Sequence, residues 1–171
     1  MKKIKTERLV LKSFEEKDIQ LMVELLKNKE IKKTYMIPSF DNEEQYFKLA
    51  SRFLEFSLND EHYVVGIYLD NLLIGFINDV EIKGKSIELG YVVNPKFKNN
   101  GYATEALKGS INYLFENGYE EIICGAFSSN EASIKVMEKA GLILLNRMDT
   151  IQYHGVNHSC IYYSIFKGMN N

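Results

Sequence analysis

The sequence predicts one domain of the α/β class, in which a mixed β-sheet carries helices on both faces. Two observations predict it. Segments with helical periodicity come first and segments with two-residue alternation follow, and strand and helix then alternate from Ser86 to Lys139. The 171 residues are enough for one hydrophobic core, and no low-complexity tract divides them. We therefore treat residues 1–171 as a single domain.

The first half of the chain is predicted to contain one strand and two helices. Residues 8–13 form the strand, and an apolar stripe from Ile19 to Leu26 predicts a helix with acidic residues in its first turn. A second helix is expected after residue 40, where Asp41 suits the N-cap and Glu44 its capping-box partner. The aromatic face of this helix is typical of core packing.

The second half is predicted to consist mainly of strands. Asp70-Asn71 has the composition of a two-residue hairpin turn between two alternating segments. The strand over residues 86–93 ends at Asn94-Pro95, because proline cannot donate to a ladder. The other expected elements are strands over 63–69, 72–82 and 121–127, helices over about 100–116 and 130–139, and a final hairpin over 142–153 and 157–167.

A short polar turn separates the strand over 86–93 from the helix that follows it. Its residues are Lys98, Asn99, Asn100, Gly101, Tyr102 and Ala103. The first amides of a helix have no partner within the helix, and the helix dipole favours negative charge there. Gly101 would let a ligand approach the backbone. The turn is therefore a candidate site for an anion such as a phosphate, although an ordinary strand-to-helix connection has the same pattern.

Composition and charge exclude several classes of function. A net charge of −2 gives no signature of nucleic-acid binding, and no apolar run approaches the length of a membrane span. Cys124 and Cys160 lack metal-binding spacing and fit buried thiols in a reducing compartment. His154 and His158 flank the predicted hairpin turn without an evident fourth ligand. We expect a cytoplasmic protein with no metal, and neither nucleic acid nor membrane as a partner.

Several motifs resemble those of one enzyme family. Residues 98–103 resemble the Arg/Gln-x-x-Gly-x-Gly/Ala pyrophosphate-binding signature of the GNAT superfamily of acetyl-CoA-dependent N-acetyltransferases. Residues 88–93 (ELGYVV) resemble its central strand, and residues 130–133 together with 138–142 resemble its second cofactor motif. Residues 6–12 (TERLVLK) resemble the opening of the ribosomal-protein N-acetyltransferase, or RimJ/RimL-like, branch.

The resemblance covers residues 5–166 and implies a fold and a cofactor site. It implies a mainly antiparallel mixed sheet of about seven strands, with the pantetheine arm entering a gap between the strands over 87–93 and 121–127. The cofactor-binding residues that it implies are Val92, Val93, Lys98, Asn99, Asn100, Gly101, Tyr102, Ala103 and Asn130. Lys98 departs from the usual Arg or Gln, because it offers a charge without a planar fork.

Two residues are candidates for catalysis. Glu88 lies on a central strand between apolar neighbours, where partial burial would raise its pKa toward that of a useful general base. The alternative is a structural role, in which Glu88 is a carboxylate on the face of the strand that bonds to neighbouring backbone or to a lysine. Many relatives carry a proton-donating tyrosine where this chain has Met137. In the ribosomal-protein branch a serine is the proposed donor, and Ser133 matches it, although Ser133 is equally compatible with a helix-surface hydroxyl.

The resemblance implies direct transfer of an acetyl group from acetyl-CoA to a primary amine, without a metal. The acceptor would be the N-terminus of a ribosomal protein or another peptide, or a small amine. A polyamine or aminoglycoside acetyltransferase is the first alternative. The second is a non-catalytic sensor that binds acyl-CoA, which the changes at Lys98 and Met137 would permit. Either a monomer or a homodimer fits this function.

Overall fold

The computed structural model describes residues 2–169 and contains one mixed sheet of eight strands. The strands are β1 (Lys3–Lys5), β2 (Val10–Lys12), β3 (Val64–Leu69), β4 (Leu72–Lys83), β5 (Ser86–Val93), β6 (Glu121–Phe127), β7 (Ile143–Tyr153) and β8 (Val156–Phe166). Their order across the sheet is β1-β2-β3-β4-β5-β6-β8-β7, and only β5 and β6 pair in parallel. The α/β class and the mainly antiparallel sheet are thus confirmed. The sheet has eight strands where about seven were expected, since the three-residue β1 adds an edge.

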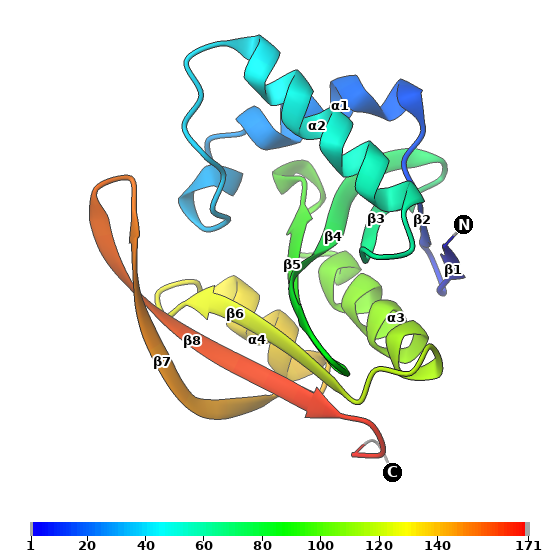
Figure 1. Ribbon diagram of the computed structural model, residues 1–171, viewed down its shortest axis with the longest axis vertical. Helices are drawn as coiled ribbons and strands as arrows, with labels where there is room; N and C mark the ends of the chain where they lie inside the picture. Colours follow the sequence, from blue (N-terminus) through cyan, green and yellow to red (C-terminus); the bar gives the residue numbers. More distant parts are fainter. Residues whose placement is uncertain (1, 170–171) are drawn as a thin grey trace.

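Helices cover both faces of the sheet, as predicted. The helices are α1 (Ile19–Lys27), α2 (Glu43–Leu58), α3 (Tyr102–Glu116) and α4 (Glu131–Lys139). Single 3-10 turns are η1 (Glu16–Asp18), η2 (Ile31–Lys33) and η3 (Pro95–Phe97). Helices α1 and α2 lie on one face, and α3 and α4 on the other (Figure 1).

The alternation of β5 directs its side chains into two hydrophobic cores, one on each face of the sheet. On β5, Ile87 and Leu89 are buried in the core that includes α3 and α4. Val92, which points to the other face, packs in the core formed with α1 and α2. A strand buried on both faces is held firmly in register, because a slip of one residue would exchange the two sets of side chains. Strand β5 is therefore a rigid support for the polar groups that it carries.

The structure corrects the predicted start of α2. Asn42 is the N-cap, and its side chain accepts a hydrogen bond from the Gln45 amide at 3.1 Å. The Gln45 side chain in turn accepts from the Asp41 amide at 3.0 Å. The prediction of Asp41 and Glu44 was wrong by one residue, because both registers of this polar segment suit a capping box.

Other local differences are small. The acidic residues expected in the first turn of α1 lie one turn earlier, in η1. The predicted hairpin turn is confirmed, since Asp70 and Asn71 have φ values of 47° and 67°, the left-handed conformation that such turns require. Across residues 2–169, no helix combines the length and apolar character needed to cross a membrane.

Candidate functional site

Strands β5 and β6 diverge in the middle of the sheet. Their parallel pairing begins at Ser86 and Glu121 and ends at Leu89 and Cys124. Beyond that point β5 stays paired with β4 and β6 stays paired with β8. The two strands therefore open like a V toward their carboxyl ends (Figure 1). Such an opening leaves backbone groups of both strands without sheet partners.

A cavity of about 890 Å³ follows this opening. It runs from the turn before α3, past the end of β5, to the face of β5 that carries Glu88. Of the site residues expected from the sequence, the cavity is lined by Glu88, Val92, Val93, Lys98, Asn99, Gly101, Tyr102, Ala103, Asn130 and Ser133. Asn100 does not line it, because its side-chain amide donates back to the carbonyls of Phe97 and Lys98. The size is in the range of small-molecule sites.

The turn before α3 is built to present backbone amides. Asn99 and Gly101 both have left-handed backbones, with φ values of 62° and 78°. Within residues 2–169, no hydrogen bond is made by the amides from Asn99 to Thr104. Adjacent amides in such a conformation, at the positive end of a helix, form an anion-binding concavity.

The end of β5 places one more amide in the opening. The Asn94 amide donates to the Ile74 carbonyl of β4 at 2.7 Å. Because successive amides of a strand point to opposite edges, the Val93 amide points away from β4, toward the gap. A carbonyl oxygen lying in the gap would meet this donor.

Glu88 lies on the face of β5 opposite to Leu89, as the alternation predicts. Its carboxylate is 3.8 Å from the Arg147 guanidinium, which stacks over the Tyr162 ring at 3.6 Å from the centroid. Burial raises the pKa of Glu88 above its usual range, and Arg147 opposes that shift. The carboxylate is thus less acidic than an exposed one, which suits a general base.

Tyr91 is a polar residue of the site that sequence reasoning missed. Its hydroxyl lies 2.7 Å from the Ser133 hydroxyl and donates to the Ser133 carbonyl at 3.0 Å. It lines the same cavity, and burial raises its pKa, so the phenol keeps its proton at neutral pH. The alternation of β5 placed Tyr91 with the buried residues, and only its contact with α4 reveals a polar role.

Asn130 and Met137, at the start and toward the end of α4, have different surroundings. Asn130 is the N-cap of α4, and its side-chain oxygen accepts from the Ser133 amide at 3.2 Å. Met137 is fully buried in the core and does not line the cavity. The position at which relatives carry a tyrosine therefore supplies packing in this chain.

Residues 33–36 line the cavity, and a segment distant in the sequence holds them in place. The Tyr153 hydroxyl, near the tip of the β7–β8 hairpin, donates to the Lys32 carbonyl at 2.8 Å and accepts from the Ile37 amide at 3.3 Å. Ser39 and His154 lie 3.1 Å apart beside it. The connection between α1 and α2 is thereby held against the hairpin. This clasp, formed by Tyr153 and residues 32–37, was not predicted.

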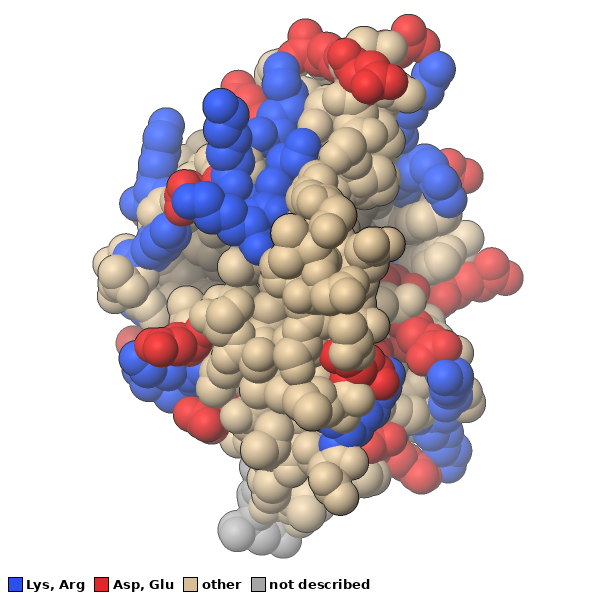
Figure 2. Space-filling view, turned by 90° about the vertical axis from the view of Figure 1, so that its left-hand side faces the viewer, with Lys and Arg blue, Asp and Glu red and all other residues tan. Residues whose placement is uncertain are grey.

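The side that contains the clasp is partly basic. Figure 2 shows lysines and arginines gathered on the upper part of this side, next to a hollow. Lys33 and Lys98 line the cavity, and Glu30 pairs with Lys33 at 2.7 Å. Cationic side chains at the mouth suit a ligand that carries phosphates.

His154 and His158 belong to the β7–β8 hairpin. His158 stacks on Phe127, with 4.2 Å between the ring centroids. Across residues 2–169, no three His, Cys, Asp or Glu side chains come close enough together to hold a metal ion.

Comparisons with known proteins agree on one family. The family model described as acetyltransferase (GNAT) domain matches residues 8–143. The N-acetyltransferase YnaD of Bacillus subtilis (strain 168) is 32% identical over 143 residues, which is 81% of each chain. A GNAT-family acetyltransferase from Bacillus anthracis has a TM-score of 0.83 at 29% identity, covering 96% of this chain and 98% of the other. RimL, a ribosomal L7/L12 alpha-N-protein acetyltransferase in complex with coenzyme A, has a TM-score of 0.84 at 18% identity, covering 96% and 98%.

Proposed function

Because the chain belongs to the GNAT family of acetyltransferases, we propose that it transfers an acetyl group from acetyl-CoA directly to a primary amine. The observation that carries this proposal is the single cavity at the diverging ends of β5 and β6. It connects unbonded amides at the start of α3 with a partly buried carboxylate at Glu88. The amides at one end suit the phosphates of acetyl-CoA, and the carboxylate at the other end is placed to accept the proton of the attacking amine.

The acceptor that we propose is the N-terminus of a ribosomal protein or another peptide, or a small amine. Residues 6–12 resemble the ribosomal-protein branch, and the fold is shared with RimL. The wall that would meet the acceptor is formed by residues 33–36, which the clasp holds in place, and by Tyr162 on β8.

Binding would use the backbone more than side chains. The amides from Asn99 to Thr104 would donate to the pyrophosphate, and Lys98 would add a positive charge. Val92 and Val93 would line the pantetheine arm with apolar surface, and the Asn130 amide group is free to bond its polar groups. These residues fit acetyl-CoA, which supplies the acetyl group as a reactive thioester.

Two proton movements accompany the transfer. The Val93 amide would bond the thioester oxygen, where negative charge develops. Glu88 would accept the proton of the attacking amine. The departing sulfur needs a proton, and Ser133, bonded to the Tyr91 hydroxyl, would deliver it. The Tyr91 phenol would return a proton to Ser133 and regain its own from solvent, while Glu88 would release the proton of the amine to solvent, which restores all three groups.

Direct transfer, without an acetylated cysteine, agrees with the raised pKa values of the two cysteine thiols. Burial raises the pKa of the Cys124 thiol, and the negative charge of the Glu88 carboxylate raises it further. Burial also raises the pKa of Cys160. A nucleophilic cysteine requires a thiolate at neutral pH. Neither thiol has that character, so an acetyl-cysteine step has no support here.

The proposal is tested with acetyl-CoA and a panel of acceptors that includes ribosomal-protein N-terminal peptides, polyamines and aminoglycosides. Release of free CoA is measured with and without each acceptor, and the product is identified by mass spectrometry. We expect one class of amine to stimulate release strongly and to gain 42 Da, roughly the mass of an acetyl group less one hydrogen. Tight binding of CoA with no acceptor-dependent release would instead identify an acyl-CoA sensor.

A further inference from the structure

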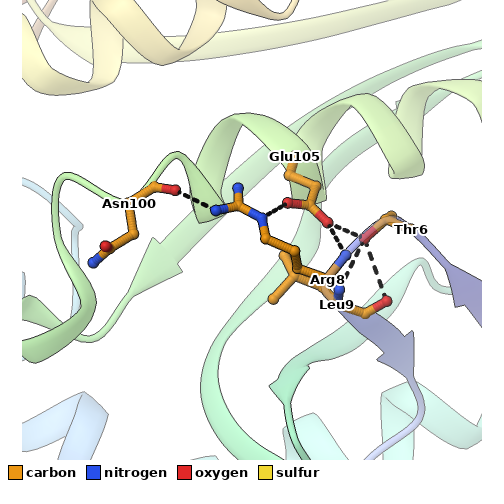
Figure 3. A network of polar contacts seen from close by, with 5 residues as sticks. All are labelled: Thr6, Arg8, Leu9, Asn100 and Glu105. Carbon is orange, nitrogen blue, oxygen red and sulfur yellow. Dashed lines mark hydrogen bonds and ion pairs between the residues drawn. The ribbon is translucent and has the colours of Figure 1, made fainter.

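Arg8 connects the N-terminal segment to the turn before α3. Its Nε donates to Glu105 at 2.7 Å, and its Nη1 donates to the Asn100 carbonyl at 2.9 Å (Figure 3). Its guanidinium carbon also lies 4.7 Å from the centroid of the Tyr102 ring. Asn100 and Tyr102 flank Gly101, within the turn that we propose binds the pyrophosphate. Arg8 thus holds the turn from outside the cavity.

Glu105 fixes the position of the Arg8 side chain. Its carboxylate accepts from the Thr6 hydroxyl at 2.5 Å and from the Arg8 amide and Nε at 2.7 Å each. Burial alone would raise the pKa of Glu105, but these bonds outweigh it and the pKa lies below its usual range. The carboxylate is therefore ionised at neutral pH and keeps the guanidinium in one orientation.

The contact of Arg8 with the Asn100 carbonyl fixes the orientation of the peptide bond between Asn100 and Gly101. In a trans peptide the carbonyl oxygen and the amide hydrogen point in opposite directions. Binding of the Asn100 carbonyl by Arg8 therefore turns the Gly101 amide to the other side. Gly101 has a φ of 78°, and glycine visits both signs of φ at little cost, so this peptide is free to flip unless it is held.

We propose that Arg8 is a positioning residue for the cofactor site, which prevents this peptide from flipping and keeps the Gly101 amide directed at the pyrophosphate of acetyl-CoA. The inference rests on the proposed function. A flipped peptide would point the Asn100 carbonyl at the phosphate, and two negatively polarised groups would then face each other. The role also explains why Lys98 suffices in place of a planar side chain, because the backbone itself is held in the binding geometry.

The test compares Arg8→Gln with the wild type, using CoA, dephospho-CoA and pantetheine. Dephospho-CoA keeps the pyrophosphate and lacks the 3′-phosphate, whereas pantetheine lacks both. Binding is measured by calorimetry, and by ligand-observed NMR for pantetheine. We expect affinity for CoA and dephospho-CoA to fall equally, by roughly 10- to 100-fold, the loss typical of one hydrogen bond to a charged group. Affinity for pantetheine should not change.

Glu105→Gln gives a second variant, because it removes the charge and one of the two oxygens that accept from Thr6 and Arg8, while the bond from Arg8 to Asn100 can remain. It should weaken CoA and dephospho-CoA by a smaller factor and leave pantetheine unchanged. The matched control is Arg52→Gln, whose guanidinium lies over the Phe56 ring on α2, away from the turn. It should bind all three ligands as the wild type does.

Three results would overturn the inference. The first is an unchanged CoA affinity in Arg8→Gln. The second is an equal loss of affinity for all three ligands, which would indicate general damage to the site. The third is a loss confined to CoA, which would indicate that Arg8 contacts the 3′-phosphate. The melting temperature of each variant is measured alongside. If the wild type itself does not bind CoA, the proposed function fails first, so the two failures are distinguishable.

Discussion

At the scale of single residues, Glu88 is the group on which the proposed proton transfer depends. Its burial raises its pKa, so it becomes protonated, and inactive as a base, at a higher pH than an exposed glutamate. Turnover should therefore rise as the pH rises through this pKa, since the carboxylate form is the active one.

We expect Glu88→Gln to lower turnover by roughly 10²–10⁴-fold, the usual contribution of a general base. Glutamine keeps the size of the side chain but cannot accept the proton. Affinity for CoA should change little, and residual activity should grow at high pH, where more of the acceptor is unprotonated. Steady-state rates between pH 6 and 9 give the measurement.

The control is Glu120→Gln, which changes an exposed carboxylate that pairs with Lys85 at the far end of β5. It should leave turnover near that of the wild type. A Glu88→Gln enzyme with wild-type rates over the whole pH range would assign Glu88 a structural role.

Tyr91 and Ser133 make a separate prediction about the leaving group. Tyr91→Phe removes the hydroxyl 2.7 Å from Ser133 and should lower turnover by roughly 10²-fold, the lower end for a proton-transfer group. The defect should shrink with a thioester of a more acidic thiol, because such a thiol departs without protonation. Ser133→Ala should show the same dependence. An equal defect with both thioesters would mean that Tyr91 only positions α4.

At the scale of elements, the start of α3 carries the proposed pyrophosphate site. Gly101→Val should weaken CoA binding by at least roughly tenfold, because a Cβ at this position would lie 3.4 Å from Arg8 Nη2 and a branched side chain would displace the guanidinium that holds the turn. It should also lower the free energy of unfolding by about 1–3 kcal/mol, since valine is strained at a φ of 78°. Calorimetry and chemical denaturation measure the two effects.

Gly118→Val is the matched control for Gly101→Val. Gly118 follows the other end of α3, has a φ of 97°, and leaves open space where a Cβ would stand. It should lose comparable stability and keep wild-type CoA affinity. If both variants lost affinity equally, strain in α3 would explain the effect and the phosphate site would not be needed.

At the scale of the whole molecule, the clasp joins segments that are more than a hundred positions apart in the sequence. Tyr153→Phe removes the bond to Lys32 and should lower the free energy of unfolding by about 0.5–1.5 kcal/mol. The KM for the acceptor should rise, because the wall of its site becomes less ordered, while CoA affinity stays unchanged. Steady-state kinetics and calorimetry separate the two.

Tyr119→Phe serves as the control for the clasp, because Tyr119 lies between α3 and β6, at the opposite end of the sheet from the hairpin tip. A rise in KM for the acceptor in both variants, or in neither, would contradict a role of the clasp at the acceptor site.

The sequence by itself determined the class of the fold and the position of the turn at which we propose that the cofactor binds. Strands β5 and β6 were predicted within one residue, because the alternation of β5, the mostly apolar run of β6 and the flanking Pro95 and Gly118 are local signals. The turn from Lys98 to Ala103 was found for the same reason, since a glycine between a strand and a helix is readable without knowledge of the fold.

Only the tertiary structure decided what surrounds those local features. Arg8 meets Asn100, Tyr91 meets Ser133, and Tyr153 meets Lys32, across separations of 92, 42 and 121 positions. No periodicity connects such pairs, because they depend on the order of the strands and on how α4 and the hairpin pack against the sheet. The Glu88 carboxylate gains its raised pKa in the same way, from burial that the chain acquires only when it folds.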